Sequence, residues 1–314
     1  MNPADTIKQK GLALGLDLVG IADAAPVDAE QAGLLATWLR SGCAAQMSYM
    51  HRNFEKRIDP ARLLENARSV ICAGLNYKPA QSTPRLEKTA PAGRIADYAQ
   101  YEDYHPFMKK LLRKLTDSIA SLVGGDIRFK ICVDSTPLAE RAFAARAGLG
   151  FIGRNHMLIN RKLGPQIFLG EIITDLELRT DRPSGADCAG CNKCIEACPT
   201  GALRPDGRFD ATRCISYLTI EHRDEIATDL TVKIGDKLFG CDECVLACPY
   251  QQKGPPCRNK RFKFYEDRAR VSLHEVLDMS PENFEAKFGG SVIKRLGLNR
   301  LKRNARICLA NVTR

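Results

Sequence analysis

No run of apolar residues in this 314-residue sequence approaches the about 18 that a membrane-spanning helix needs. The N-terminal segment, MNPADTIKQKGLALGLDLVG, also lacks the long apolar core of a secretory signal. Internal repeats and low-complexity stretches are absent as well. We therefore expect a cytoplasmic protein with no membrane association. Its apolar share of 44% and charged share of 27% suit a chain that buries a core.

Thirteen cysteines are unusual in a chain that has neither the small size nor the secretory signal of a disulfide scaffold. In a cytoplasmic protein these thiols need a role other than cross-linking. Eight of the thirteen lie between Cys188 and Cys248. This stretch is therefore the first candidate for a metal-binding module.

The net charge of +10 is also distributed unevenly along the chain. Residues 188–250 hold 7 basic and 10 acidic side chains, whereas residues 258–314 hold 14 basic and 6 acidic ones. The cysteine-rich stretch is therefore locally acidic. The basic surplus is concentrated at the C-terminal end, where an anionic partner would be attracted.

Apolar periodicity divides the first 180 residues into alternating helices and strands. Helical spacing predicts helices over 4–17, 29–42 and 105–124. Runs of β-branched and apolar residues predict strands over 67–77, 126–135 and 164–178. This alternation indicates helices packed against a sheet, in an α/β or α+β arrangement.

The spacing of the first cysteines matches the iron–sulfur run of bacterial ferredoxins. The run is Cys188-x2-Cys191-x2-Cys194-x3-Cys198, and a proline follows it. In this pattern the first three thiolates bind one [4Fe–4S] cluster, and the fourth binds the other cluster of a two-cluster protein. A second run, Cys241-x2-Cys244-x3-Cys248, also precedes a proline.

The second run lacks one cysteine, because a full repeat would have it at the position of Leu238. Cys214 is the one cysteine of this stretch left without a role, so we expect it to supply the missing ligand. The predicted ligands are Cys188, Cys191, Cys194 and Cys248 for one cluster, and Cys198, Cys214, Cys241 and Cys244 for the other. Paired CxxC motifs also bind zinc, but zinc sites do not need this spacing twice.

Three segments follow from these patterns. An N-terminal α/β domain, 1–180, ends at a polar stretch with Pro and Gly. A ferredoxin-like module for two [4Fe–4S] clusters occupies 181–257, and a short, basic, helical segment occupies 258–314. The predicted fold class is therefore a mixed α+β or α/β fold with an inserted iron–sulfur module.

A glycine pattern, Gly148-x-Gly150-x-x-Gly153, matches the dinucleotide-binding fingerprint. That fingerprint requires a strand before the glycines and a helix after them. Here a helical stretch precedes the glycines and a strand follows them. We therefore do not expect a nicotinamide cofactor.

Several longer motifs are typical of a known family. They are EKRIDPARLLENARSVI, VDSTPLAERAFAARAGLGFIGRN, GPQIFLGEI and RCISYLTIEHR, together with the cysteine pattern. On these motifs the chain resembles tRNA epoxyqueuosine reductase, from about residue 10 to about residue 310. That family removes the epoxide oxygen in the last step of queuosine synthesis, at the wobble base of certain tRNAs.

The resemblance implies cobalamin as a third redox centre, in base-off form and without a protein histidine ligand. The D-x-H-x-x-G signature of His-ligated corrinoid proteins is absent from the sequence. The cobalamin contacts that the resemblance implies are Arg57, Tyr98, Asp134, Leu158, Leu169, Ser216 and Asp242. From the residues alone, Arg57 also fits a solvated surface charge, and Ser216 and Asp242 fit local turns.

Reductive removal of an epoxide oxygen takes two electrons and two protons and leaves an alkene and water. Two clusters deliver electrons singly, so a cobalt corrin would collect them and act on carbon. A proton donor is then needed, and the resemblance favours Asp134 at the end of a strand. A carboxyl beside an apolar corrin is expected to have a raised pKa. From the residues alone, Asp134 fits a helix N-cap before Pro137 instead.

The basic C-terminal end is the expected region of tRNA contact, through phosphates that fix position without reading sequence. The candidates are Arg261, Lys263, Lys294 and Arg295, with His222 and Arg223 nearer the target nucleotide. Charge runs are also typical of solvated faces, and Phe262 and Phe264 alternate like core residues. Longer family members continue into helical repeats that grip the tRNA. We therefore expect a smaller or differently organised contact surface here.

Two other functions are compatible with the cysteine pattern. A corrinoid reductase of a small molecule, such as a reductive dehalogenase, has a similar domain plan, but a basic tail has no purpose there and no twin-arginine signal is seen. An electron carrier or activator for another corrinoid protein would leave the first 180 residues without a function. We therefore expect a monomeric tRNA epoxyqueuosine reductase that receives electrons from an external low-potential donor.

Overall fold

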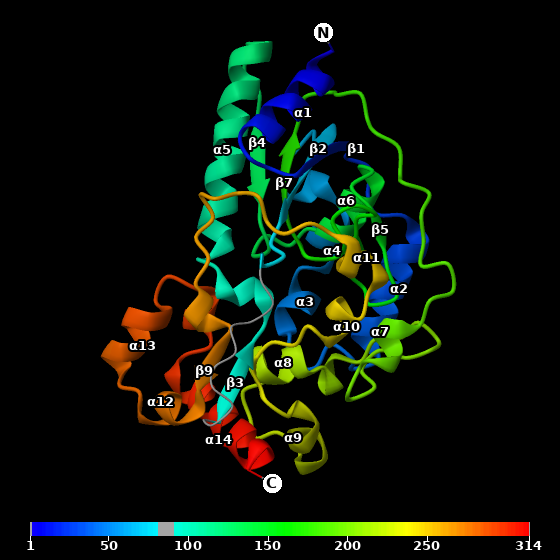
Figure 1. The fold of residues 1–314 in the computed structure, drawn as a ribbon. Helices are drawn as coiled ribbons and strands as arrows, with labels where there is room; N and C mark the ends of the chain where they lie inside the picture. Colours follow the sequence, from blue (N-terminus) through cyan, green and yellow to red (C-terminus); the bar gives the residue numbers. More distant parts are fainter. Residues whose placement is uncertain (1, 81–90, 314) are drawn as a thin grey trace.

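A four-stranded antiparallel sheet forms the N-terminal half of the structure (Figure 1). The computed structural model describes residues 2–80 and 91–313. The strands, in sheet order, are β1 (Leu18–Asp23), β2 (Ser69–Asn76), β7 (Ile167–Thr174) and β4 (Phe129–Cys132). The last three lie within the predicted strands, whereas β1 follows directly on a helical pattern and was not predicted. Helix–strand alternation predicted a sheet but not the direction of its strands, which are antiparallel throughout.

Helices cover both faces of this sheet. Strand β2 is buried along its whole length, and its successive side chains point to opposite faces. Ile71 belongs to the core beneath α1 (Pro3–Ala13) and α5 (Tyr104–Val123). Val70 belongs to the core beneath α6 (Glu140–Arg146), together with Phe143. The apolar run that predicted this strand is therefore continuous because neither face meets water.

The remaining helices and the shortest strands surround this sheet. In the N-terminal part they are α2 (Ala29–Arg40), α3 (Ser48–Arg52), α4 (Phe54–Ile58), η1 (Pro60–Arg62), η2 (Asp97–Gln100), β5 (Phe151–Ile152) and β6 (Leu158–Ile159). The cysteine-rich part contains α7 (Lys193–Glu196), η3 (Ala211–Arg213), α8 (Ile215–Ile220), α9 (Thr228–Ile234), α10 (Glu243–Leu246) and α11 (Pro249–Lys253). No helix in the described ranges has both the length and the apolar character that crossing a membrane requires.

A second, three-stranded sheet joins the three predicted segments. Its strands are β8 (Lys237–Phe239), β3 (Ala92–Ile95) and β9 (Arg270–Ser272), with β3 in the centre. Strand β3 runs parallel to β8 and antiparallel to β9. Each strand comes from a different predicted segment, so the segments share one sheet, and their boundaries as folding units stay a prediction.

The C-terminal helices complete a core around this second sheet. They are α12 (Leu273–Asp278), α13 (Pro281–Phe288) and α14 (Leu298–Val312), with η4 (Glu266–Arg268) and η5 (Val292–Arg295) between them. Leu238 of β8, Val271 of β9 and Ala305 of α14 are all buried in this core. The basic C-terminal segment is therefore part of the packed structure, and it is helical as the sequence predicted.

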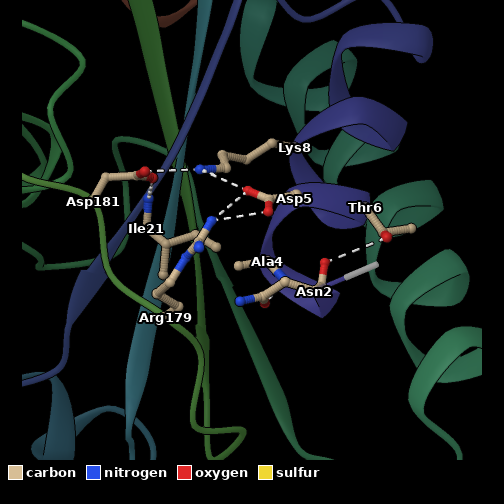
Figure 2. Close-up of polar contacts among 8 residues, drawn as sticks. All are labelled: Asn2, Ala4, Asp5, Thr6, Lys8, Ile21, Arg179 and Asp181. Carbon is tan, nitrogen blue, oxygen red and sulfur yellow. Dashed lines mark hydrogen bonds and ion pairs between the residues drawn. The ribbon is translucent and has the colours of Figure 1, made fainter.

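The segment that connects the large sheet to the cysteine-rich part begins with two residues, Arg179 and Asp181, whose side chains contact α1 and β1 (Figure 2). The Asp181 carboxylate accepts hydrogen bonds from the Ile21 amide, at 2.9 Å, and from Lys8 Nζ, at 2.7 Å. The Asp181 amide donates to the Ile21 carbonyl at 2.7 Å, which adds backbone pairing to the outer edge of β1. Arg179 and Asp5 form an ion pair between the same segment and α1.

We expect Asp181→Ala to lower the apparent melting temperature of the holoprotein by about 2–4 °C. The substitution removes two hydrogen bonds to a carboxylate, one of them from the amide of buried Ile21. Arg179→Ala is the control, because it removes only the exposed ion pair and should cost about 1 °C or less. Equal effects of the two substitutions in thermal scans at one heating rate would contradict a special role for Asp181.

Candidate active site at Asp134 and two groups of cysteines

Asp134 lies in a tight loop directly after β4, with its backbone in the left-handed region at φ 53°. This conformation is uncommon for residues other than glycine, although Asp tolerates it better than most. The Asp134 amide donates to Glu140 Oε1 at 2.6 Å, which holds the loop in this shape. Helix α6 begins at Glu140 with Ala139 as its N-cap, so the alternative role of Asp134 as an N-cap is wrong. Its side chain is 54% exposed and free to meet a ligand.

The side chain of Asp134 contacts a histidine that the sequence analysis did not single out. His105 Nε2 lies 3.0 Å from Asp134 Oδ2, and His105 Nδ1 lies 2.6 Å from Asp103 Oδ1. Asp103 is the N-cap of α5, where it also accepts the His105 amide hydrogen at 2.9 Å. Arg295 of η5 completes the group, with Nη1 at 3.2 Å from His105 Nε2. The imidazole is 5% exposed and lies between two carboxylates.

These contacts set the protonation states of the pair. The hydrogen bond from His105 lowers the pKa of Asp134; burial opposes this, and the charges of Arg295 and Arg57 add to it. Burial would lower the pKa of His105, but the hydrogen bonds and charges of Asp103 and Asp134 outweigh it and raise that pKa. The sequence predicted a raised pKa for Asp134. The structure shows the opposite direction, because the nearest partner of the carboxylate is a cation rather than an apolar surface.

A buried pair of carboxyl groups lies behind the Asp134 loop. Glu171 of β7 is fully buried, and among the described residues neither of its oxygens meets a donor. Burial raises the pKa of Glu171 well above its usual value, and it raises the pKa of Glu140 to about 7. A proton on Glu171 allows it to hydrogen-bond the Glu140 carboxyl, which in turn accepts the Asp134 amide. Burial therefore favours a proton on the inner carboxyl group, Glu171.

We expect the free energy of unfolding of this protein to fall as the pH rises from about 4.5 to beyond 7. A carboxyl whose pKa is raised on folding stabilises the fold fully below its unfolded pKa, and this contribution is lost as the pH passes the folded pKa of about 7. Glu171→Gln keeps a donor for Glu140 but does not titrate, so its melting temperature should fall less over this range. Glu30→Gln, on the exposed start of α2, is the control. Parallel pH curves for Glu171→Gln and the parent would contradict this account.

The eight cysteines of the iron–sulfur motifs lie in two groups. Burial raises the pKa of the Cys248 thiol, and the charges of Cys188 and Cys191 raise it further. The same two neighbours act on Cys194, so these four thiols lie close together. The second group shows the same pattern: burial and the charges of Cys241, Cys214 and Cys198 raise the pKa of Cys244. The thiols within each set are therefore near enough for their charges to interact, and their role as cluster ligands stays a prediction.

Backbone amides point at several of these sulfur atoms. The Arg154 amide donates to Cys188 Sγ at 3.4 Å. Cys214 and Cys248 are the N-caps of α8 and α11, and neither side chain makes a capping hydrogen bond. Burial raises the pKa of each thiol, and nearby backbone amides of the helix start act in the opposite direction. In the described ranges no group of three or more potential ligands surrounds a single ion. A [4Fe–4S] cube instead takes one thiolate at each of four irons, and N–H···S bonds tune its potential.

Two family models match this chain. The model described as "Epoxyqueuosine reductase QueG, DUF1730" matches residues 57–135, and the model described as "4Fe-4S double cluster binding domain" matches residues 187–251. The epoxyqueuosine reductase of Cyclobacterium marinum is 37% identical over 95% of this chain and 94% of its own length. The chain belongs to the epoxyqueuosine reductase family.

Solved epoxyqueuosine reductases have the same fold. One, solved with an epoxyqueuosine-modified tRNA-Tyr stem loop, matches with a TM-score of 0.91 and 31% identity, over 98% of this chain and 80% of that chain. Another, from Bacillus subtilis, matches with a TM-score of 0.89 and 30% identity, over 98% of this chain and 81% of that chain. It is described with an aspartate catalytic loop swung out of the active site. The mixed α and β architecture and the double-cluster domain are therefore features of the family.

The cobalamin contacts inferred from the epoxyqueuosine reductase family lie at different depths. Arg57 on α4 is close enough to Asp134 for their charges to interact, and its Nε is buried without a partner in the described structure. Burial raises the pKa of Tyr98, and the charges of Asp242 and Asp134 raise it further. The other three are hydrophobic or small: Leu158 is buried on β6, Leu169 is half-buried on β7, and Ser216 is half-buried in the first turn of α8.

The predicted tRNA contacts have different local partners in the structure. Arg295 contacts His105 at the candidate active site, and the neighbouring Lys294 pairs with Glu285 at 2.6 Å. His222 Nε2 bonds to the Glu225 carbonyl at 3.0 Å, and the adjacent Arg223 side chain is exposed. Two further candidates are held by other contacts. The Arg261 guanidinium donates to the Leu14 carbonyl, and Lys263 Nζ lies 4.6 Å from the ring centre of Tyr265.

One alternative for the aromatic residues of this region is confirmed. Phe262 is 3% exposed and stacks on Tyr101, with ring centres 4.6 Å apart. It therefore packs in the core and is not available to stack on a base.

Among the residues missed from sequence, Glu171 had the clearest signal, since an acidic residue inside an apolar strand has to be neutralised or paired.

Proposed function

We propose that this protein reduces epoxyqueuosine to queuosine at the wobble position of tRNA. The reaction takes two electrons and two protons per epoxide and releases water. The observation that supports it best is a half-exposed carboxylate, Asp134, that is hydrogen-bonded to a buried imidazole, His105, and is close enough to Tyr98 for its charge to raise the pKa of that phenol. A relative with this fold is known with epoxyqueuosine-modified RNA, which supports the same substrate here.

We assign the two cysteine groups to two [4Fe–4S] clusters. The ligand sets are Cys188, Cys191, Cys194 and Cys248 for one cluster, and Cys198, Cys214, Cys241 and Cys244 for the other. The first set takes three ligands from the first run and one from the second, whereas the second set takes one from the first run, two from the second, and Cys214 from between them. The two clusters therefore tie the halves of the module together and form a short path for single electrons from an external low-potential donor.

We expect Cys214→Ala to lower the iron and sulfide content of the anaerobically purified protein by about half. Cys214 supplies the ligand that the second run lacks, and alanine cannot replace it. Cys43→Ser is the control, because Cys43 belongs to neither group and should leave the iron content unchanged. Full iron content in Cys214→Ala would show that another residue completes the second cluster.

Three buried donors suit cobalamin. Arg57 Nε, near Asp134, and Arg154 Nε and His156 Nε2, on the loop between β5 and β6, lack partners among the described residues, and the corrin periphery carries amide oxygens that accept such donors. We propose that Arg57, Tyr98, Leu158, Leu169, Ser216 and Asp242 contact this cofactor in base-off form. Bound cobalamin supplies a cobalt centre that collects single electrons and reacts at carbon. The protein holds the substrate, excludes water and delivers protons from Asp134.

We propose that tRNA approaches over the face that contains Arg295. His222, Arg223, Lys294 and Arg295 would contact the anticodon arm near the active site, and Arg261 and Lys263 would contact phosphates farther away. Because Arg295 also contacts His105, the approaching backbone would meet the catalytic group directly. The monomeric state and the cytoplasmic location stay predictions from the sequence.

We expect Asp134→Asn to lower turnover of epoxyqueuosine-containing tRNA about 100-fold or more, the usual contribution of a general acid. The amide keeps the size of the side chain, so cluster content and corrin absorption should not change. Asp126→Asn, at an exposed position before β4, is the control and should keep full activity. Full activity of Asp134→Asn would remove Asp134 from the mechanism. Absence of corrin from a protein with both clusters would instead favour an electron carrier.

A further inference from the structure

The imidazole of His105 is placed to exchange a proton with Asp134. We propose that Asp103, His105 and Asp134 form a proton relay, in which His105 supplies the proton that Asp134 delivers to the substrate. In this relay Arg295 stabilises the neutral imidazole that remains after the transfer. The inference rests on the proposed role of Asp134 and names the residue from which its proton comes.

Asp134 needs such a source because it does not keep a proton of its own. Its pKa lies below the usual range, mainly through the hydrogen bond from His105, so at neutral pH it is a carboxylate. A carboxylate accepts protons but cannot donate one. The nearest group that holds a proton is the imidazole, whose Nε2 lies 3.0 Å from Asp134 Oδ2. This distance suits a hydrogen bond along which a proton can pass.

Asp103 fixes which ring nitrogen takes part in the exchange. Its Oδ1 lies 2.6 Å from Nδ1 of His105, and the same oxygen accepts the His105 amide hydrogen. This carboxylate therefore keeps a proton on Nδ1 in both states of the ring, which leaves Nε2 as the nitrogen that gains and loses its proton. Asp103 is 22% exposed and is positioned as the N-cap of α5, so the ring is held rigidly.

Arg295 gives the ring a partner after the proton has left. A guanidinium only donates hydrogen bonds, so its contact with Nε2, at 3.2 Å, is favourable only when Nε2 carries no proton. Nε2 therefore has two partners: Asp134 when protonated and Arg295 when neutral. Arg295 also lies 3.7 Å from Asp103 Oδ2, which holds it close to the ring in both states.

The surroundings of the imidazole favour internal transfer over exchange with water. The titratable and charged groups that face it are Asp103 and Tyr104 from its own helix, Asp134 from the loop after β4 and Arg295 from η5, with Arg57 and Glu140 behind Asp134. The ring stacks on Tyr104, with ring centres 4.0 Å apart. Because His105 is 5% exposed and Asp134 is half-exposed, Asp134 is the route by which protons enter and leave.

The relay accounts for one of the two protons of the reduction. The Nε2–H bond of His105 breaks as an O–H bond forms on Asp134, and that proton then passes to the oxygen released from the epoxide. The two electrons come from the external reductant and do not pass through these residues. After product release, solvent protonates Asp134, which returns the proton to Nε2. His105 is thus a positioning and proton-supplying residue, and Asp134 is the group that meets the substrate.

Nitrogen NMR of the ring tests the relay independently of turnover. The chain has five histidines, so ¹⁵N-histidine labelling of the oxidised holoprotein gives few ring signals, and those of His105 are the ones missing from His105→Gln. We expect His105 to titrate above the usual value of about 6.5, and Asp134→Asn to lower this midpoint by about one unit. A midpoint at or below the usual value, or one unchanged by Asp134→Asn, would overturn the relay.

Kinetics at saturating tRNA provide the second arm. His105→Gln should lower kcat about 100-fold with little change in tRNA affinity, cluster content or corrin content, and it should remove the alkaline limb of the pH profile. Arg295→Gln should shift that limb to higher pH, because loss of the neighbouring positive charge favours the protonated ring. His274→Gln, at an exposed position on α12, is the control and should behave as the parent.

The outcomes separate the relay from the function on which it rests. If Asp134→Asn is inactive but His105→Gln keeps normal kcat and the parent pH profile, the relay fails and Asp134 remains the donor. If Asp134→Asn is fully active, the role of Asp134 itself fails. A purely structural role of His105 would lower melting temperature and cofactor content together, without a selective loss of the alkaline limb.

Discussion

The pairing of β3 with β8 and β9 is the constraint on which the candidate site depends. The chain leaves β3 directly into η2, which contains Tyr98, and then into α5, which contains His105 and has Asp103 as its N-cap. It leaves β8 into the second cysteine run, with Asp242, and it continues from β9 through the C-terminal helices to Arg295. Three short strands thus bring together groups that lie far apart in the sequence.

Charge balance around Asp134 explains why this loop holds its uncommon conformation. Three carboxyl groups, those of Asp134, Glu140 and Glu171, lie in succession from the surface into the interior of the large sheet. They would repel one another if all were ionised. The innermost group keeps a proton because it is buried, and the outermost group loses its proton because His105 is beside it. The Asp134 amide then bonds to Glu140, which stabilises a left-handed backbone that would otherwise be strained.

Much of this arrangement could be predicted from sequence where the signal is local. The ferredoxin spacing predicted two groups of four cysteines, and long periodic runs predicted α2 and α5. The three-stranded sheet could not be predicted, because strands of three or four residues show no periodicity and pair across long distances in the chain. The predicted direction of the pKa shift of Asp134 was wrong for a related reason. Its nearest partner, His105, lies 29 residues away in sequence, and a lone histidine near a helix start gives no signal.

The C-terminal segment shows how a charge count differs from a charged surface. Arg268 is 3% exposed and donates to the Tyr101 and Lys287 carbonyls, both at 2.9 Å. Arg303 donates to the Leu218 and His222 carbonyls, and so fastens the turn after α8 onto α14. These guanidinium groups donate hydrogen bonds to main-chain carbonyl groups that helix ends and turns leave without a main-chain donor. Part of the basic surplus therefore stabilises the fold. An RNA backbone would meet only the remainder, with Arg295 nearest the site of chemistry.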